Sequence, residues 1–136
     1  MSVFDDLWND EQLTGKQVIE KLWSMQAGKN VYFALTTEDK HEPDKYPVND
    51  FFSWRGSYCE PSIWSEGDTV YPCSYLIKKL EEFFNSVQTG WKGGEFAMDE
   101  DCRLWCDPEG YAMQRGVKAV IEDECAIYIV VGQFEF

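Results

Sequence analysis

Hydrophobic residues recur at helical spacing in two stretches of this chain. The first helix is predicted to begin at Thr14, because Thr14 and Gln17 form the pattern of a capping box. Gly28 fits the C-terminal stop of this helix. Its single broad apolar face consists of Val18, Ile19, Leu22, Trp23 and Met25.

The second helix is predicted to run from Pro72 or Cys73 to Val87, with Gly90 as its stop. Its apolar residues repeat every third or fourth position and predict a buried stripe of Leu76, Ile77, Leu80, Phe83, Phe84 and Val87. The polar residues between them are expected to face water, and these are Lys78, Lys79, Glu81 and Glu82.

Shorter runs rich in β-branched and aromatic residues predict strands. They cover residues 31–36, 51–58 with an interruption or bulge at Gly56, 63–64, 95–98, 103–106, 117–122 and 125–131. The last two runs are separated by Asp123 and Glu124, which predicts a hairpin. Residues 126–131 are almost wholly apolar, as in a central strand buried on both faces. Residues 37–50 are polar, include Pro43 and Pro47, and are predicted to form a surface loop.

The order helix, strands, helix, strands predicts an α+β fold, with a mainly antiparallel sheet of about five or six strands covered by two helices. A chain of 136 residues is most simply a single domain, residues 1–136. Residues 1–13 are predicted to form an acidic N-terminal arm, which Phe4, Leu7 and Trp8 can dock.

Charge narrows the choice of partners. The chain has 12 Lys and Arg against 25 Asp and Glu, a formal net charge of −13. Such a field repels phosphates, so direct binding of nucleic acid is not expected. It suits a protein partner with a basic surface, including one that normally holds nucleic acid. Taken alone, the charge is better explained by solubility.

Membrane and secreted classes do not fit this sequence. No apolar run reaches the roughly 18 residues of a membrane span. The acidic N-terminus lacks the basic and apolar regions of a signal peptide. We therefore expect a cytoplasmic protein with no membrane partner, in which the five cysteines are reduced thiols.

Signals for metal binding and catalysis are weak. Cys102 and Cys106, with His41 as the single histidine, do not form a zinc-finger pattern. The acidic run 99–101 with Asp107 and Glu109 is better explained as a solvated turn than as a Mg²⁺ or Ca²⁺ site. No known catalytic motif is present, so we expect neither an enzyme nor a cofactor.

Two glycine turns place a cation beside aromatic rings, in residues 54–58 and 90–99. Cations beside rings commonly grip planar or anionic partners. Arg55 either forms a structural ion pair with Asp99 or Glu60 or points into a pocket. Gly93 and Gly94 either form a tight turn between the second helix and a strand or cradle a phosphate, and the turn is favoured.

A longer pattern joins these turns. It contains Arg-Gly-x-Tyr at residues 55–58, a helix beginning near Thr69, Thr-Gly-Trp-Lys-Gly-Gly-Glu-Phe-x-Met-Asp at 89–99, and Leu-Trp at 104–105. In residues 51–110 the chain resembles a group of small phage-encoded accessory proteins, from which it departs at Trp54, Trp91 and Cys102-Arg103. The resemblance implies a viral context in the host cytoplasm, and by analogy interference with host defence.

The leading hypothesis is a phage-type, non-enzymatic binding protein that blocks a host or defence protein with a basic surface. The residues predicted to bind are Trp54, Arg55, Tyr58, Trp91, Lys92, Gly93, Gly94, Asp99 and Trp105. The alternative is a small-ligand binder or sponge, in which Arg55, Lys92 and Arg115 hold the phosphates of a nucleotide while a ring stacks on its base. An enzyme acting on a small metabolite ranks third.

Overall fold

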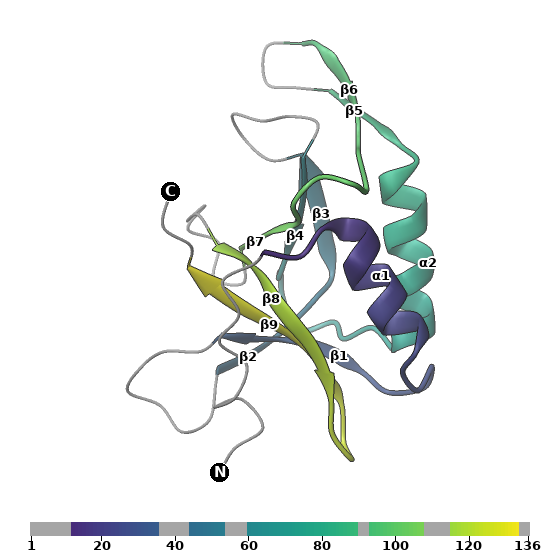
Figure 1. The fold of residues 1–136 in the computed structure, drawn as a ribbon, viewed down its shortest axis with the longest axis vertical. Coiled ribbons are helices and arrows are strands. Elements are labelled where there is room, and N and C mark those ends of the chain that lie inside the picture. Colours follow the sequence, from purple (N-terminus) through teal and green to yellow (C-terminus); the bar gives the residue numbers. More distant parts are fainter. Residues whose placement is uncertain (1–11, 36–43, 54–59, 90–92, 108–114, 134–136) are drawn as a thin grey trace.

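A computed structural model describes residues 12–35, 44–53, 60–89, 93–107 and 115–133 of the protein. Within them, two helices lie side by side on one face of a seven-stranded sheet (Figure 1). The helices are α1 (Gly15–Trp23) and α2 (Cys73–Phe84). The strands of the sheet are β1 (Val31–Leu35), β2 (Asp44–Pro47), β3 (Asp50–Ser53), β4 (Pro61–Trp64), β7 (Trp105–Asp107), β8 (Arg115–Glu122) and β9 (Ile127–Gln133). A separate two-stranded ribbon consists of β5 (Val87–Thr89) and β6 (Glu95–Ala97).

The sheet is mixed, with the strand order β2-β1-β9-β8-β7-β4-β3. The pairs β1–β9 and β4–β7 are parallel, and the other neighbours are antiparallel. Between β4 and β7 the chain passes through α2, which supplies the crossover that parallel neighbours require. The α+β class with two helices is confirmed. The predicted sheet was too small and lacked the parallel pairs, because these join strands that are distant in the sequence.

The capping box at the start of α1 is confirmed. The Thr14 hydroxyl accepts a hydrogen bond from the Gln17 amide at 3.2 Å, and the Gln17 side-chain oxygen accepts one from the Thr14 amide at 2.9 Å. The predicted stop at Gly28 is wrong, because the helix already ends at Trp23. The cap residue Ser24 ends it by donating from its hydroxyl and its amide to the Lys21 carbonyl.

The predicted apolar stripe of α2 is confirmed as far as Phe84. The helix ends there because the amide and hydroxyl of Ser86 both donate to the carbonyl of Phe83. Val87 therefore belongs to β5, where it is 60% exposed, and its assignment to the buried stripe is wrong. The predicted stop at Gly90 is wrong for the same reason.

The two helices run antiparallel. At one end, Gly15 at the start of α1 lies against the ring of Phe84 at the end of α2. At the other end, the Cys73 thiol donates to the Leu22 carbonyl at 3.4 Å. Because Gly15 has no Cβ, the Phe84 ring can pack directly against the α1 backbone.

The predicted loop over residues 37–50 contains a strand. Residues 44–47 form β2, which pairs antiparallel with β1, and Val48 behind it is fully buried. β2 is an edge strand, where the missing N–H of Pro47 is tolerated. The sequence did not predict this strand, because its residues are mostly polar and an edge strand need not show an alternation of apolar and polar residues.

The predicted hairpin of the last two strands is confirmed, with β8 and β9 antiparallel. Residues 123–126 connect the two strands, and within them the Asp123 amide donates to the Ala126 carbonyl at 3.0 Å. A register shift between Val117 and Ala119 marks a bulge in β8. The predicted central strand is also confirmed, because β9 lies between β1 and β8 and its residues 127–131 are all buried. The interruption predicted at Gly56 lies outside the described residues.

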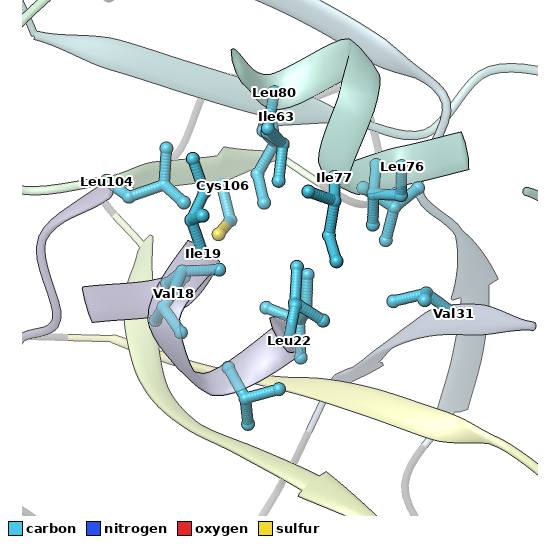
Figure 2. Packing of buried hydrophobic residues seen from close by; sticks show 14 of the residues in the cluster. Val18, Ile19, Leu22, Val31, Ile63, Leu76, Ile77, Leu80, Leu104 and Cys106 are labelled. Atoms are coloured by element: carbon cyan, nitrogen blue, oxygen red, sulfur yellow. The ribbon is translucent and has the colours of Figure 1, made fainter. Parts of the chain in front are cut away.

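The main core lies between the helices and the sheet. In Figure 2, Val18, Ile19 and Leu22 of α1 and Ile77 of α2 extend into the same apolar interior, with Ile63, Leu104 and Cys106 contributed by the sheet side. A second buried cluster consists of Ala34 of β1, Tyr128 and Val130 of β9, and Ala126 just before β9. β9 thus contributes apolar side chains to both clusters.

The junction between β7 and β8 includes part of the predicted N-terminal arm. Leu13 is buried, its amide donates to the Val117 carbonyl, and its carbonyl accepts from the Leu104 amide. Gln12 reaches the Leu104 carbonyl at 3.1 Å and packs closely over Gly116. These two residues therefore belong to the packed body, and residues 1–11 lie outside the described residues.

Candidate functional site

The acidic run predicted as a solvated turn lies at the N-terminal end of α1. The Lys16 amide donates to the Glu100 carbonyl at 2.8 Å, and the Gly15 amide donates to the Cys102 carbonyl at 3.2 Å. Within the turn, the Asp99 carboxylate accepts from the Asp101 amide at 2.9 Å. Residues 99–101 are all exposed. The turn is therefore fixed by backbone bonds, and its carboxylates lie near the positive end of the helix dipole.

An arginine, a glutamate and a tryptophan form a cluster beside this turn. The Arg103 guanidinium lies 3.3 Å from Glu60 Oε1 and 5.0 Å from the centre of the Trp105 ring. The indole N–H of Trp105 donates to Glu60 Oε2. One carboxylate therefore binds both the indole edge and the guanidinium, while that guanidinium lies over the indole ring. We call this arrangement the Glu60 triad.

Sequence position explains how the Glu60 triad is assembled. Glu60 immediately precedes β4, Trp105 begins β7, and the register of these parallel strands places Ser62 opposite Trp105. Sequence analysis had considered Glu60 as a partner of Arg55. In the structure Glu60 binds Arg103, which is one of the positions at which the sequence departs from the phage group.

The predicted binding residues fall into two groups. Trp54, Arg55, Tyr58, Trp91 and Lys92 lie outside the described residues. Of the remainder, Gly93, Gly94 and Asp99 are exposed, whereas Trp105 is 3% exposed and offers little surface to a partner.

Gly93 and Gly94 lie just before β6, in the link that joins β5 to β6, so they connect two strands and not a helix to a strand. Gly93 has a φ of 89°, a backbone conformation that glycine adopts without strain. The ribbon of β5 and β6, which we call the hairpin arm, projects beyond the end of α2 (Figure 1). The structure therefore does not bring these glycines to Trp105 in the main sheet.

One face of the hairpin arm is exposed. Val87 pairs with Ala97 and Thr89 pairs with Glu95, so these four residues share a face. All four are exposed, and Val87 is among the most exposed large apolar residues described.

Trp23 is an exposed aromatic residue that sequence analysis placed in the core. It is 64% exposed at the end of α1, and its indole N–H donates to Glu81 Oε1 on α2 at 3.2 Å. The sequence does contain a signal for this exposure, which is the angular position of Trp23 around the helix. Trp23 lies at the margin of the stripe formed by Val18, Ile19 and Leu22.

Two carboxyl groups meet at the start of β3. The Glu66 carboxyl hydrogen-bonds to the Asp50 carboxylate, and this bond and the negative charge of Asp50 raise the pKa of Glu66. Asn49 holds the adjoining loop, because its amide donates to the carbonyls of Glu66 and Thr69 and its oxygen accepts from the Glu66 amide.

The described cysteines are free thiols. Burial, with a smaller contribution from the charge of Glu122, raises the pKa of the Cys73 thiol and keeps it protonated. Cys59 lies outside the described residues. Across the described ranges, no group of three or more His, Cys, Asp or Glu side chains could hold a metal ion.

Comparison of the chain with protein-family models, curated proteins and solved structures found no match. Among the helices of the described residues, neither is long and apolar enough to cross a membrane.

Proposed function

We propose that this protein is a non-enzymatic binding protein of the phage accessory type, which inhibits a host or defence component by occupying its basic surface. The observation that carries the proposal is that exposed carboxylates are held on two ordered turns, residues 99–101 and 122–124. Preformed acidic turns cost little ordering entropy on binding and complement a basic patch.

The second turn is as firmly held as the first. The Asp123 carboxylate accepts from the amides of Cys125 and Ala126 at 2.8 and 2.9 Å. Glu122 accepts from the Gln26 amide at 2.9 Å and lies 3.4 Å from the Lys29 ammonium. These bonds connect the turn to the segment that follows α1.

Apolar anchors are also part of the proposal. Trp54 and Trp91 remain proposed contacts, in keeping with the enrichment of tryptophan at interface hot spots. Trp105 has a different proposed role, because its indole holds Glu60 beneath Arg103. It would support the surface beside turn 99–101 without touching the partner.

Affinity capture from host lysate, followed by mass spectrometry, would identify the partner for kinetic tests. Association with the purified partner should slow markedly between low and physiological salt, since the Debye length falls to about 8 Å. A triple variant, Asp99→Asn with Glu100→Gln and Asp101→Asn, should slow association further.

The matched control removes three charges elsewhere on the surface, with Glu66→Gln, Asp68→Asn and Glu82→Gln. It should slow association less than the turn variant. An association rate that is indifferent to salt, or equal effects of the two triple variants, would contradict the role of turn 99–101.

The nucleotide alternative has no supporting observation in the described residues, because Arg55 and Lys92 lie outside them and Arg115 is placed only as the first residue of β8. Thermal melts with nucleotides test it directly, since a ligand that binds the native state must raise the melting temperature. No change at high nucleotide concentration would eliminate this alternative.

A further inference from the structure

The exposed pair Trp23–Glu81 has two of the three components of the Glu60 triad, the tryptophan and the glutamate. In the triad, the Glu60 carboxylate accepts from the Trp105 indole and binds Arg103, which lies over the ring. In the exposed pair, Glu81 likewise accepts an indole N–H, from Trp23. No arginine or lysine of the described residues lies over the Trp23 ring.

Trp23 is fixed before any partner arrives. It is the last residue of α1, and the bond to Glu81 ties its ring edge to the second helix. A ring that is 64% exposed and already oriented loses little freedom on binding. Its indole donor is satisfied, so the surface left to a partner is the electron-rich ring face.

Negative charge near Trp23 favours the binding of a cation on its ring. The C-terminal end of α1 carries the negative end of the helix dipole. Glu20 is one turn before Trp23 and exposed. The segment after the helix is joined to the acidic turn of β8 and β9, because the Gln26 amide donates to Glu122, whose own charge is offset by Lys29.

The nearby lysines offset this negative charge only in part. Lys21 precedes Trp23 by two residues, so it lies on the other side of α1. Lys29 is engaged with Glu122 at 3.4 Å. Lys78, exposed one turn before Glu81, is the lysine best placed to compete with an incoming cation.

We propose that Trp23 and Glu81 are a docking point for an arginine side chain on the surface of a basic protein partner. The guanidinium would stack on the indole face and bind the Glu81 carboxylate, as Arg103 does with Trp105 and Glu60. Arginine fits better than lysine, because a planar guanidinium can stack and donate in its plane at once. This inference rests on the proposed function and names one contact of its binding surface.

The test uses the whole protein and a capped peptide of alternating glycine and arginine. The NMR signal of the Trp23 indole N–H, identified by its loss in Trp23→Phe, should shift as the peptide is added. A peptide with citrulline, the neutral isostere of arginine, should give no shift. A lysine peptide of equal charge should bind about threefold or more weakly, since it cannot stack in the same way.

The Glu81→Gln variant isolates the charge, because glutamine keeps an oxygen that can accept the indole N–H. It should weaken arginine-peptide binding about three- to tenfold, as expected for an exposed ion pair combined with a cation–ring contact. Lys78→Gln should strengthen binding. Tyr75→Ala removes another exposed aromatic residue of α2 and should leave the affinity unchanged.

Equal shifts with the lysine and arginine peptides, or an unchanged affinity in Glu81→Gln, would overturn the inference. The proposed function is judged separately, by the purified partner and its salt dependence. If that partner binds Trp23→Phe and Glu81→Gln as tightly as the wild type, the docking point is refuted while the proposed function stands. If the peptide binds at Trp23 but salt does not affect partner association, the proposed function fails alone.

Discussion

Phe83 and Val87 are four residues apart on what the sequence predicts to be one helical face, yet they lie in regions of opposite character. Phe83 is 7% exposed in the body formed by the helices and the main sheet, and Val87 is 60% exposed on the hairpin arm. Ser86, between them, ends α2 by bonding to the Phe83 carbonyl. In the body, the helices and the main sheet bury their apolar residues against each other. The hairpin arm carries Gly93 and Gly94, and one of its faces is exposed to water. We infer that most of the stability resides in the body and little of it in the hairpin arm.

Hydrogen exchange should give the largest contrast between the regions. Amides of the buried strand β9 should exchange only through global unfolding, at about 5–15 kcal/mol for a small domain. Amides of β5 and β6 should exchange through local opening at a few kcal/mol at most, because an isolated ribbon is marginally stable. NMR-detected exchange measures both. Equal protection would show that the arm unfolds together with the body.

Truncating one apolar side chain in each region tests the same division. Phe83→Ala should lower the free energy of unfolding by about 3–5 kcal/mol, because the ring packs against Phe51 and Phe84. Val87→Ala should change it by roughly 0.5 kcal/mol or less. Urea unfolding of both variants measures the difference, and similar losses would break the comparison.

A glycine substitution tests the contact between the helices of the body. Alanine favours a helix over glycine by about 1 kcal/mol, so propensity alone would make Gly15→Ala stabilising. The structure predicts the opposite sign, because the new Cβ would lie 2.6 Å from Cζ of Phe84. We expect a loss of about 1–3 kcal/mol in chemical unfolding.

Gly28→Ala is the matched control for Gly15→Ala. A Cβ at Gly28 would meet nothing within 4 Å, so unfolding should be nearly unchanged. A stabilised Gly15→Ala variant would mean that α1 and α2 are not packed as described.

The smallest expected effect concerns the pH dependence of the body. Burial acts to raise the pKa of Asp123, but hydrogen bonds from the amides of Ala126 and Cys125 outweigh it, and the pKa is lowered. Asp123 therefore contributes stability above its unfolded pKa, and this contribution is lost as pH falls through its lower folded pKa. Asp123→Asn should reduce this acid sensitivity in thermal melts.

Glu66 provides a comparison of opposite sign. Its pKa is raised, so its contribution is present below the unfolded pKa and is lost as pH rises through the folded pKa. Glu66→Gln should therefore remove a small loss of stability on raising the pH. If both variants changed the pH profile in the same direction, one of the two pKa assignments would be wrong.

Local signals predicted much of the body. The Thr14–Gln17 capping box, the stripe of α2 up to Phe84 and the hairpin of β8 and β9 are all visible in short windows of sequence. Each depends on neighbouring residues only, on spacing in the helices and on a polar turn in the hairpin. These are the features that periodicity and capping can specify.

The remainder of the fold depends on distant pairing. β2 is recognisable only through its pairing with β1, and the parallel pairs become visible only once the sheet is assembled. The ends of both helices were predicted too far along the chain. Ser24 and Ser86 donate hydrogen bonds to carbonyls of the last helical turn, so each helix ends without a glycine.

The candidate site was predicted in part. The acidic turn and Trp105 were identified from the sequence, and Glu60 was one of the alternatives open for Arg55, but the pairing of Glu60 with Arg103 was not predicted. The Glu60–Trp105 bond joins residues 45 positions apart and depends on the β4–β7 register. Trp23 was misplaced because helical periodicity does not separate the margin of a buried stripe from its centre.

The parallel pairing of β1 with β9 has a consequence for synthesis on the ribosome. β1 is made early, but the strand that must lie beside it spans residues 127–133. Until that strand has emerged, the middle of the sheet is missing, and Phe33 and Val31 lack their neighbour. The nascent chain should therefore remain a client for chaperones and proteases over most of its synthesis. Chains released before residue 127 should be degraded, and should not accumulate as shortened folded forms.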